Sequence, residues 1–374
     1  MQSALAPLLQ PGRIGSLQVR NRIVVPPMQS GRVKDWVPTW AMTEGLAAHG
    51  RGGAGLIFSE GCGLDHPSSF SLPALACLTP RSLSAWREVV EAVHATGASI
   101  FIQLWHPGAA RESEPGSPTA DYPTLSASGL AAKDKPAGRA MTSVELDEVR
   151  EAYGVAAERV KAIGADGVEI HAGHGYILDS FLWSATNLRD DDYGGSTLAE
   201  RSRYPAEIVQ TVRAAVGPDF PISLRFSQFK GGNYDAKIVS SPEELRTFLG
   251  LFRGAGVDCF HVSTRRIFAP AWPELDDRLP LAGFVSSMTD AAVIAVGSMG
   301  LQTDLYQTFT TPMENGAFVV AHLEKAAQLV SDGWADFIAI GRGQIANTDL
   351  VEKMKQGRID ELVSFDKARH LPNV

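Results

Sequence analysis

Eight short apolar runs recur along the chain, and each is followed by a turn and a helical pattern. The runs are almost continuously apolar, which is typical of parallel strands that are covered by helices on one side and a packed interior on the other. They are Ile23–Pro26, Gly55–Ser59, Ser99–Leu104, Gly167–His171, Ile222–Phe226, Cys259–Ser263, Val293–Val296 and Phe337–Ile340. Eight strand–helix units predict a closed (β/α)8 barrel, and a barrel commonly reaches 374 residues as one domain. We therefore expect a single domain over residues 1–374.

Capping residues mark the helices between these runs. A helix is predicted to begin near Ser143 and to end at Gly164, because a polar cap precedes an apolar stripe and a glycine follows it. Ser196 and Thr197 offer caps for a second helix, which we expect to continue through Val216.

Two stretches are extra to a minimal barrel. They are Arg111–Arg139, between the third and fourth units, and Met299–Phe318, after the seventh run. Segments that follow strands lie at the C-terminal face of a barrel, where active sites are built. We expect both stretches to form lids or walls of a substrate pocket.

Charge and cysteine content narrow the class of protein. The chain has 34 Lys and Arg against 42 Asp and Glu, and this net charge of −8 disfavours nucleic acid or an anionic membrane as a partner. The N-terminus lacks a signal-like segment, and no window approaches the about 18 apolar residues of a membrane helix. Three scattered cysteines fit neither a disulfide framework nor a zinc or iron–sulfur site. We expect a soluble, reduced, cytoplasmic protein.

The densest group of reactive side chains follows the fourth run, in Asp166-Gly-Val-Glu-Ile-His171-Ala-Gly-His174-Gly-Tyr176. The neutral imidazoles of His171 and His174 can hold a carbonyl or nitro oxygen, and the Tyr176 phenol can deliver a proton nearby. A structural histidine pair beside a packed tyrosine is the alternative. A zinc site would need further ligands, and only Glu169 is near.

Other polar residues lie at or after strand ends. Gln103 offers a donor and an acceptor, which suits the edge of a heterocycle or ordinary hydrogen bonding. Arg225 places a permanent charge in a barrel strand, where it pairs with a carboxylate or faces an anionic cofactor. Lys230 could form a Schiff base, but an exposed loop lysine is the simpler interpretation. The run Asp190–Asp192 indicates a solvated acidic turn, because it lacks the spacing of a calcium loop.

Two glycine turns follow the last two runs. They are Gly297-Ser298 and Gly341-Arg342-Gly343. Barrels tend to bind phosphate at this position, with backbone N–H groups and a cation. The turns therefore predict a phosphate site.

Three motifs are shared with a known family. They are Asn21-Arg-Ile-Val-Val-Pro-Pro-Met28, Ile102-Gln-Leu-Trp-His-Pro-Gly108 and the segment from Asp166 to Tyr176, followed by Phe181-Leu182, Asn187, Arg189 and Asp192-Tyr-Gly-Gly-Ser196. On these residues the chain resembles the old yellow enzyme family of FMN-dependent ene-reductases over nearly its whole length. The resemblance implies a barrel that holds FMN noncovalently at its C-terminal mouth. It also implies ping-pong hydride transfer from NAD(P)H to flavin N5 and then to an activated alkene.

Residue roles follow from the same resemblance, position by position. His171 and His174 would bind the substrate oxygen and Tyr176 would protonate the α-carbon, with Trp105 beside them. Gln103 resembles the partner of the flavin pyrimidine edge, and Arg225 resembles the cation near flavin N1 and O2. The cofactor-binding residues would be Pro26, Pro27, Met28, Gln29, Gly61, Gln103, Arg225, Gly297, Ser298, Gly341 and Arg342. No metal is implied.

The chain departs from the family pattern at three places. Gln29 stands where relatives have a Thr or Cys that tunes the flavin, and Gly61 replaces the usual Ala beside the ring. A Tyr that walls the substrate pocket in one branch is missing, and Trp36, Trp40 and Trp105 are the aromatic replacements that we expect.

The leading hypothesis is an NAD(P)H-dependent FMN ene-reductase acting on α,β-unsaturated ketones or aldehydes, with nitro compounds as a further class. The alternative is flavin-dependent oxidation or demethylation of an N-methylated amine, because the same barrel serves such enzymes. Larger relatives add an iron–sulfur cluster and nucleotide-binding domains; since the chain stops at Val374, we expect neither here. We expect the reductant to reach the flavin directly, and a homo-oligomer is the default state.

Overall fold

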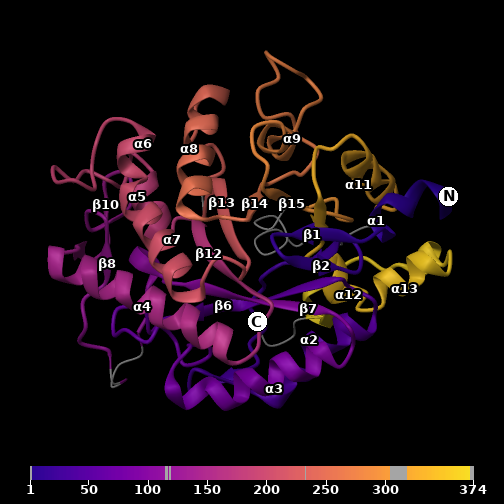
Figure 1. Cartoon of the computed structure of the whole chain (residues 1–374), viewed down its shortest axis with the longest axis horizontal. Coiled ribbons are helices and arrows are strands. Elements are labelled where there is room, and N and C mark those ends of the chain that lie inside the picture. The colour runs from indigo at the N-terminus through magenta and orange to yellow at the C-terminus, as the bar shows by residue number, and fades with distance from the viewer. Residues whose placement is uncertain (1, 114–116, 118, 232, 304–317, 371–374) are drawn as a thin grey trace.

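The structure of the protein is a computed structural model, and it describes residues 2–113, 117, 119–231, 233–303 and 318–370. Eight parallel strands close into a barrel, with helices around its outside (Figure 1). The strands are β3 (Ile23–Val25), β6 (Leu56–Gly63), β7 (Ser99–Trp105), β12 (Gly167–His174), β13 (Ile222–Lys230), β14 (Cys259–Ser263), β15 (Ala292–Val296) and β16 (Phe337–Ala339). Strand β16 pairs with β3 and closes the ring, so the predicted (β/α)8 barrel is confirmed.

Helices of very different length connect the strands. The α-helices are α1 (Ala6–Leu9), α2 (Trp40–Arg51), α3 (Leu83–His94), α4 (Ser143–Ala162), α5 (Ile177–Leu182), α6 (Leu198–Arg201), α7 (Arg203–Val216), α8 (Pro242–Ala255), α9 (Leu281–Ser286), α11 (Ala321–Ser331), α12 (Arg342–Ala346), α13 (Leu350–Lys355) and α14 (Lys367–His370). Short 3-10 helices are Gln2–Leu5, Pro80–Ser82, Gly108–Ala110 and Ile359–Glu361. Within the described ranges, no helix is both long enough and apolar enough to cross a membrane.

The predicted helix from Thr197 through Val216 is interrupted. Thr197 caps α6 as predicted, but the helix stops after Arg201 and α7 begins two residues later. Pro205 explains the break, because proline has no N–H to donate to the carbonyl four residues earlier and its ring clashes with that carbonyl.

Short strands pair outside the barrel, and one pair closes its N-terminal end. They are β1 (Gly12–Ile14) with β2 (Leu17–Val19), β4 (Val33–Lys34) with β5 (Val37–Pro38), β8 (Leu125–Ser126) with β11 (Arg139–Ala140), and β9 (Leu130–Ala132) with β10 (Lys135–Pro136). Ile14 and Val19 of the first pair pack with Phe101 and Phe337 inside the barrel. A Cβ on Gly12 would lie 2.5 Å from the Phe337 ring, so glycine is needed there. This hairpin, which the sequence did not predict, leaves the C-terminal mouth as the open end.

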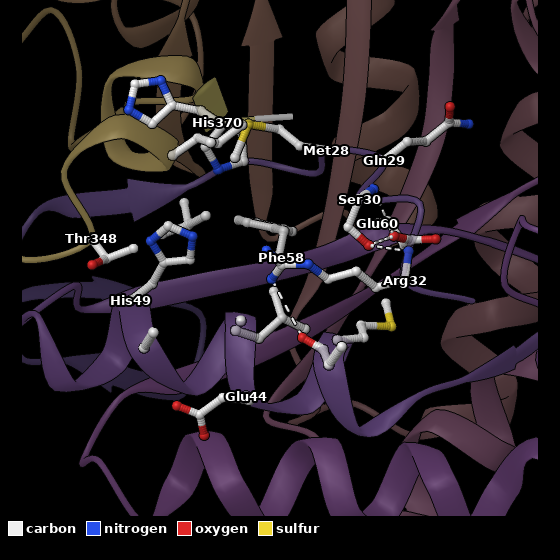
Figure 2. A pocket seen from close by; sticks show the side chains of 18 of the residues that line it. Met28, Gln29, Ser30, Arg32, Glu44, His49, Phe58, Glu60, Thr348 and His370 are labelled. Carbon is white, nitrogen blue, oxygen red and sulfur yellow. Dashed lines mark hydrogen bonds between the residues drawn. The ribbon is translucent and has the colours of Figure 1, made fainter. Parts of the chain in front are cut away.

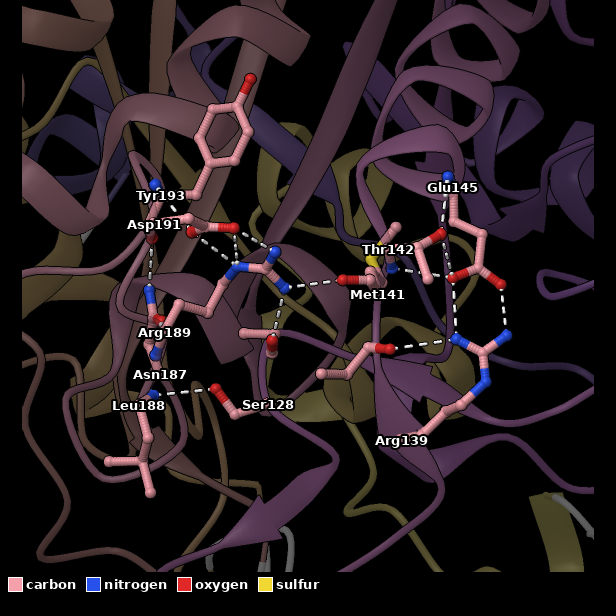
Figure 3. Close-up of polar contacts among 12 residues, drawn as sticks. Ser128, Arg139, Met141, Thr142, Glu145, Asn187, Leu188, Arg189, Asp191 and Tyr193 are labelled. Atoms are coloured by element: carbon pink, nitrogen blue, oxygen red, sulfur yellow. Dashed lines mark hydrogen bonds and ion pairs between the residues drawn. The ribbon is translucent and has the colours of Figure 1, made fainter.

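The insertion over residues 111–139 contains β8, β9, β10 and the first residue of β11, and it lies against the segment after α5. Arg189 Nη1 donates at 2.9 Å to the carbonyl oxygens of Ala127 and Met141, and Leu188 N donates to Ser128 Oγ at 2.8 Å (Figure 3). Arg189 also forms an ion pair with Asp191, which belongs to the exposed acidic turn predicted from the sequence. Most of the second insertion, residues 304–317, lies outside the described residues.

Candidate active site

His171 and His174 lie at the C-terminal end of β12, where the strand bulges. Their rings meet edge to face with centroids 5.0 Å apart, and His174 Nδ1 lies 3.1 Å from His171 Nε2. His174 has a φ of 61°, and its backbone N–H donates to Ser227 Oγ at 2.8 Å. Its Nε2 lies 2.9 Å from Ser263 Oγ on β14. Two serines from neighbouring strands therefore hold the imidazole pair at the barrel mouth.

Tyr176 follows the bulge, at the start of α5. Its ring packs edge to face on His171 at 5.0 Å and on Trp105 at 5.3 Å. Gly108, with a φ of 59°, passes under this turn; a Cβ there would lie 2.8 Å from the backbone nitrogen that follows Tyr176. The structure thus brings together the three residues predicted to act on substrate, with Trp105 beside the phenol.

Burial decides the protonation states of this group. It lowers the pKa of His171 and of His174 well below the usual 6.5, and the charge of Arg225 lowers both further. Burial also raises the pKa of Tyr176. At neutral pH the site therefore holds two uncharged imidazoles and a protonated phenol. Such a group can stabilise negative charge on an oxygen and donate a proton.

Buried neutral histidines also predict how stability depends on pH. Burial lowers the pKa of His49 to about 4 and that of His106 to about 3, as it does for the site pair. Below about pH 6.5 these histidines bind protons in the unfolded chain but stay neutral in the folded chain. The free energy of unfolding therefore falls as pH decreases, by up to about 1.4 kcal/mol per pH unit for each such histidine. Melting temperatures between pH 7.5 and 5 should show this fall, and His49→Gln should reduce it; an unchanged slope in the variant would contradict the assignment.

A buried polar network lies one layer below the site, and the sequence analysis missed it. Glu169 is fully buried and accepts from Gln103 Nε2 at 2.7 Å and from Ser223 Oγ at 2.8 Å, while His261 Nδ1 lies 2.7 Å away. Burial raises the pKa of Glu169, but His261 and Arg225 outweigh it and keep the pKa below its usual value. A carboxylate only accepts, so Gln103 turns its NH2 group to Glu169 and leaves its carbonyl oxygen for another donor.

Arg225 supplies the test of whether an anionic cofactor fits. In the described part of the chain, no carboxylate forms an ion pair with this guanidinium, and its buried Nε has no hydrogen-bond partner. Burial lowers its pKa, and Glu169 partly offsets this. A guanidinium whose buried Nε has no hydrogen-bond partner fits the electron-rich edge of a flavin better than the internal ion pair that was the alternative.

The two glycine turns lie at the ends of β15 and β16, next to β3. A Cβ on Gly341 would lie 3.2 Å from Met28 Sδ and 3.6 Å from Pro26 Cγ, so this turn meets the loop after β3. A Cβ on Gly297 would lie 2.6 Å from a backbone oxygen, which excludes any side chain there. Arg342 Nη2 donates to Thr303 O at 3.4 Å. The turn after β16 and the loop after β3, which are both predicted to bind FMN, therefore lie next to each other.

A cavity of about 430 Å³ lies behind that loop, between β3, α2 and the C-terminal helices (Figure 2). It shares Pro26, Met28 and Gln29 with the predicted cofactor residues but includes none of the imidazole and phenol group. Glu60 Oε2 accepts from Ser30 N at 3.0 Å and from Ser30 Oγ at 2.6 Å. This contact fixes the loop that carries Gln29.

The three tryptophans expected to form aromatic surface are spread apart. Trp105 packs on Tyr176, whereas Trp36 packs on Phe70 with centroids 5.4 Å apart. Trp40 is 76% exposed and lines the cavity behind the loop. Among them, Trp105 alone has a ring contact with the imidazole and phenol group in the described structure.

Lys230 is not an exposed loop lysine, and that interpretation was wrong. It ends β13, is buried, and its Nζ lies 2.6 Å from Asp179 Oδ1. Asp179 Oδ2 accepts from the backbone N–H of Gly175 at 2.6 Å. The ion pair satisfies both charges and anchors the turn before Tyr176, so Lys230 is not available as a nucleophile.

Glu169 and the acidic turn over Asp190–Asp192 carry the carboxylates that the sequence offers as candidate metal ligands. In the ranges that the structure describes, no group of three His, Cys, Asp or Glu side chains is placed to hold a metal ion. The cysteines Cys62, Cys77 and Cys259 are all free and buried.

Comparison with known proteins agrees with this geometry. Residues 7–310 match the model of the NADH:flavin oxidoreductase / NADH oxidase family. The flavin oxidoreductase hxnT of Emericella nidulans is 32% identical over 98% of this chain and 94% of its own length. The NADH oxidase of Thermoanaerobacter brockii is 33% identical over 95% of this chain, which spans 52% of that relative. The solved old yellow enzyme homologue from Zymomonas mobilis is 26% identical, with a TM-score of 0.75 over 96% of this chain and 94% of its own.

Proposed function

Because the chain belongs to the NADH:flavin oxidoreductase / NADH oxidase family, and is an FMN enzyme of the old yellow enzyme type with NAD(P)H as hydride donor, we propose that it reduces activated C=C bonds. The substrates would be α,β-unsaturated ketones and aldehydes, with nitroalkenes as a second class. The observation that carries the proposal is that the His171 ring contacts both the His174 ring and the Tyr176 ring, so two uncharged imidazoles and a protonated phenol lie in one group.

Each residue of this group has a separate task in the proposed reaction. FMN, when bound, would supply the hydride-transfer chemistry, with NAD(P)H as the source of the hydride. His171 and His174 hold the carbonyl oxygen and stabilise the negative charge that develops on it. Tyr176 gives its proton to the α-carbon, and the Trp105 ring packs edge to face on the phenol.

The cofactor would be held by residues from several strand ends. Gln103 and Arg225 would face the ring, the first with its free carbonyl oxygen and the second with its guanidinium. The full set is Pro26, Pro27, Met28, Gln29, Gly61, Gln103, Arg225, Gly297, Ser298, Gly341 and Arg342.

An anaerobic titration tests the proposal. The purified protein should be yellow, should lose its visible absorbance with NADH or NADPH, and should regain it with cyclohexenone. A tertiary N-methyl amine should leave the oxidised spectrum unchanged. Bleaching by the amine without recolouring by the enone would replace the proposal with amine oxidation, and a protein that takes up no FMN would end both.

Arg342→Ala is expected to weaken FMN binding by about tenfold or more, because it removes the cation of the proposed phosphate site. Equilibrium dialysis followed by flavin fluorescence measures the retained cofactor. Arg358→Ala is the control, since the side chain of Arg358 contacts only Gln356 and Glu361 in the part of the chain that the structure describes. Full FMN retention in Arg342→Ala would remove this residue from the phosphate site.

A further inference from the structure

A chain of hydrogen bonds fixes the proton positions on both imidazoles. The backbone N–H of Gly173 donates to His171 Nδ1 at 3.2 Å, so this nitrogen is an acceptor and the neutral ring carries its proton on Nε2. His171 Nε2 then donates to His174 Nδ1 at 3.1 Å. His174 must carry its own proton on Nε2, where Ser263 Oγ accepts it at 2.9 Å.

This arrangement gives a proton to only one of the two nitrogens that face each other, and a bound oxygen needs two. His171 Nδ1 is held by the backbone and His174 Nε2 by a serine that is 4% exposed. The nitrogens left for a ligand are therefore His171 Nε2 and His174 Nδ1, and the second presents a lone pair. A carbonyl oxygen that gains negative charge needs a proton on both.

Ser263 is a partner that allows the proton of His174 to be on Nδ1 instead of Nε2. A hydroxyl both donates and accepts, so Ser263 can accept from Nε2–H or, after rotating, donate to bare Nε2. His261, two residues earlier on β14, shows the contrast: its Nδ1 faces the carboxylate of Glu169, which only accepts and fixes one tautomer.

We propose that Ser263 sets the tautomer of His174, accepting from Nε2 when the site is empty and donating to Nε2 when an oxygen binds, so that both imidazoles present an N–H to the substrate. In the exchange His174 loses the Nε2 proton to solvent water and gains one from water on Nδ1, so its charge does not change. The inference rests on the proposed function and makes Ser263 a positioning residue.

Nitrogen NMR of the imidazole rings, with ¹⁵N-labelled histidine and phenol as the probe, tests this directly. In the FMN-loaded wild type, His174 should be protonated on Nε2 without phenol and on Nδ1 with it. Ser263→Thr keeps the hydroxyl and should behave likewise. Ser263→Ala should raise the phenol dissociation constant about tenfold, because the Nδ1–H tautomer would leave Nε2 buried and unsatisfied.

A matched control distinguishes the loss of the hydrogen bond to His174 from a general loss of structure. Ser82 is fully buried and its hydroxyl donates to Cys77 O at 2.7 Å, far from the imidazoles in the chain. Ser82→Ala should match Ser263→Ala in FMN content yet bind phenol like the wild type. Unchanged phenol affinity in Ser263→Ala, or Nδ1–H in the empty wild type, would overturn the inference. If the wild type does not bind phenol at all, the proposed function is refuted. The nitrogen NMR signals of His174 without phenol would then still show whether Ser263 sets its tautomer.

Discussion

Tyr176→Phe is expected to slow the reduction of an enone by about 10²- to 10⁴-fold, the usual worth of a positioned proton donor. The substitution removes only the phenolic oxygen and keeps the ring contacts with His171 and Trp105, so the pocket should retain its shape. Burial raises the pKa of Tyr176, so the wild-type phenol keeps its proton across the neutral range. Reduction of the flavin by NAD(P)H needs no such proton and should stay nearly intact.

Stopped-flow spectrophotometry can follow the two half-reactions separately through the flavin absorbance. Tyr193→Phe is the matched control, because its hydroxyl contacts Glu207 at 3.0 Å, away from the imidazole pair. An equal loss in both half-reactions of Tyr176→Phe would show that the tyrosine supports the pocket instead of donating a proton.

The double variant His171→Ala/His174→Ala should weaken phenol binding by about 10²-fold or more, because two buried hydrogen bonds to a charged oxygen are lost together. Titration of the flavin absorbance with phenol gives the dissociation constant. The losses of binding free energy in the two single variants should not sum to the loss in the double variant, because His174 Nδ1 lies 3.1 Å from His171 Nε2.

The control for the double variant is His94→Ala, an exposed ring that pairs with Asp166 at 2.8 Å. It should leave phenol affinity unchanged. If phenol binds the double variant as tightly as the wild type, the oxygen site lies elsewhere.

Local sequence patterns were enough to predict the barrel. Apolar runs and caps are properties of neighbouring residues, and all eight predicted runs overlap a barrel strand. The cluster of His171, His174 and Tyr176 could be predicted for the same reason, since these residues lie within six consecutive positions. Pro205 was the local signal that was overlooked, and it would have shown where the second helix breaks.

Contacts between distant parts of the chain could not be predicted in this way. The burial of Lys230 depends on Asp179, 51 residues earlier, and the Glu169 network joins side chains from four strands. Strand alternation offered one clue, since Glu169 and His171 are two apart and share a face of β12. The contacts that Glu169 and His171 make with the next strand depend on the register between the strands, which the sequence of one strand does not contain.

The hairpin of β1 and β2 determines how this protein could be attached to a solid support. Its tip, at Gly15 and Ser16, is exposed and lies at the end of the barrel opposite the mouth, with Ser16 Oγ donating to Asp219 O at 2.6 Å before β13. Because all three native cysteines are buried, a cysteine placed at Ser16 would be the accessible thiol of the molecule. A single thioether bond to an electrode at that position would orient every molecule alike, with the flavin mouth facing the solution.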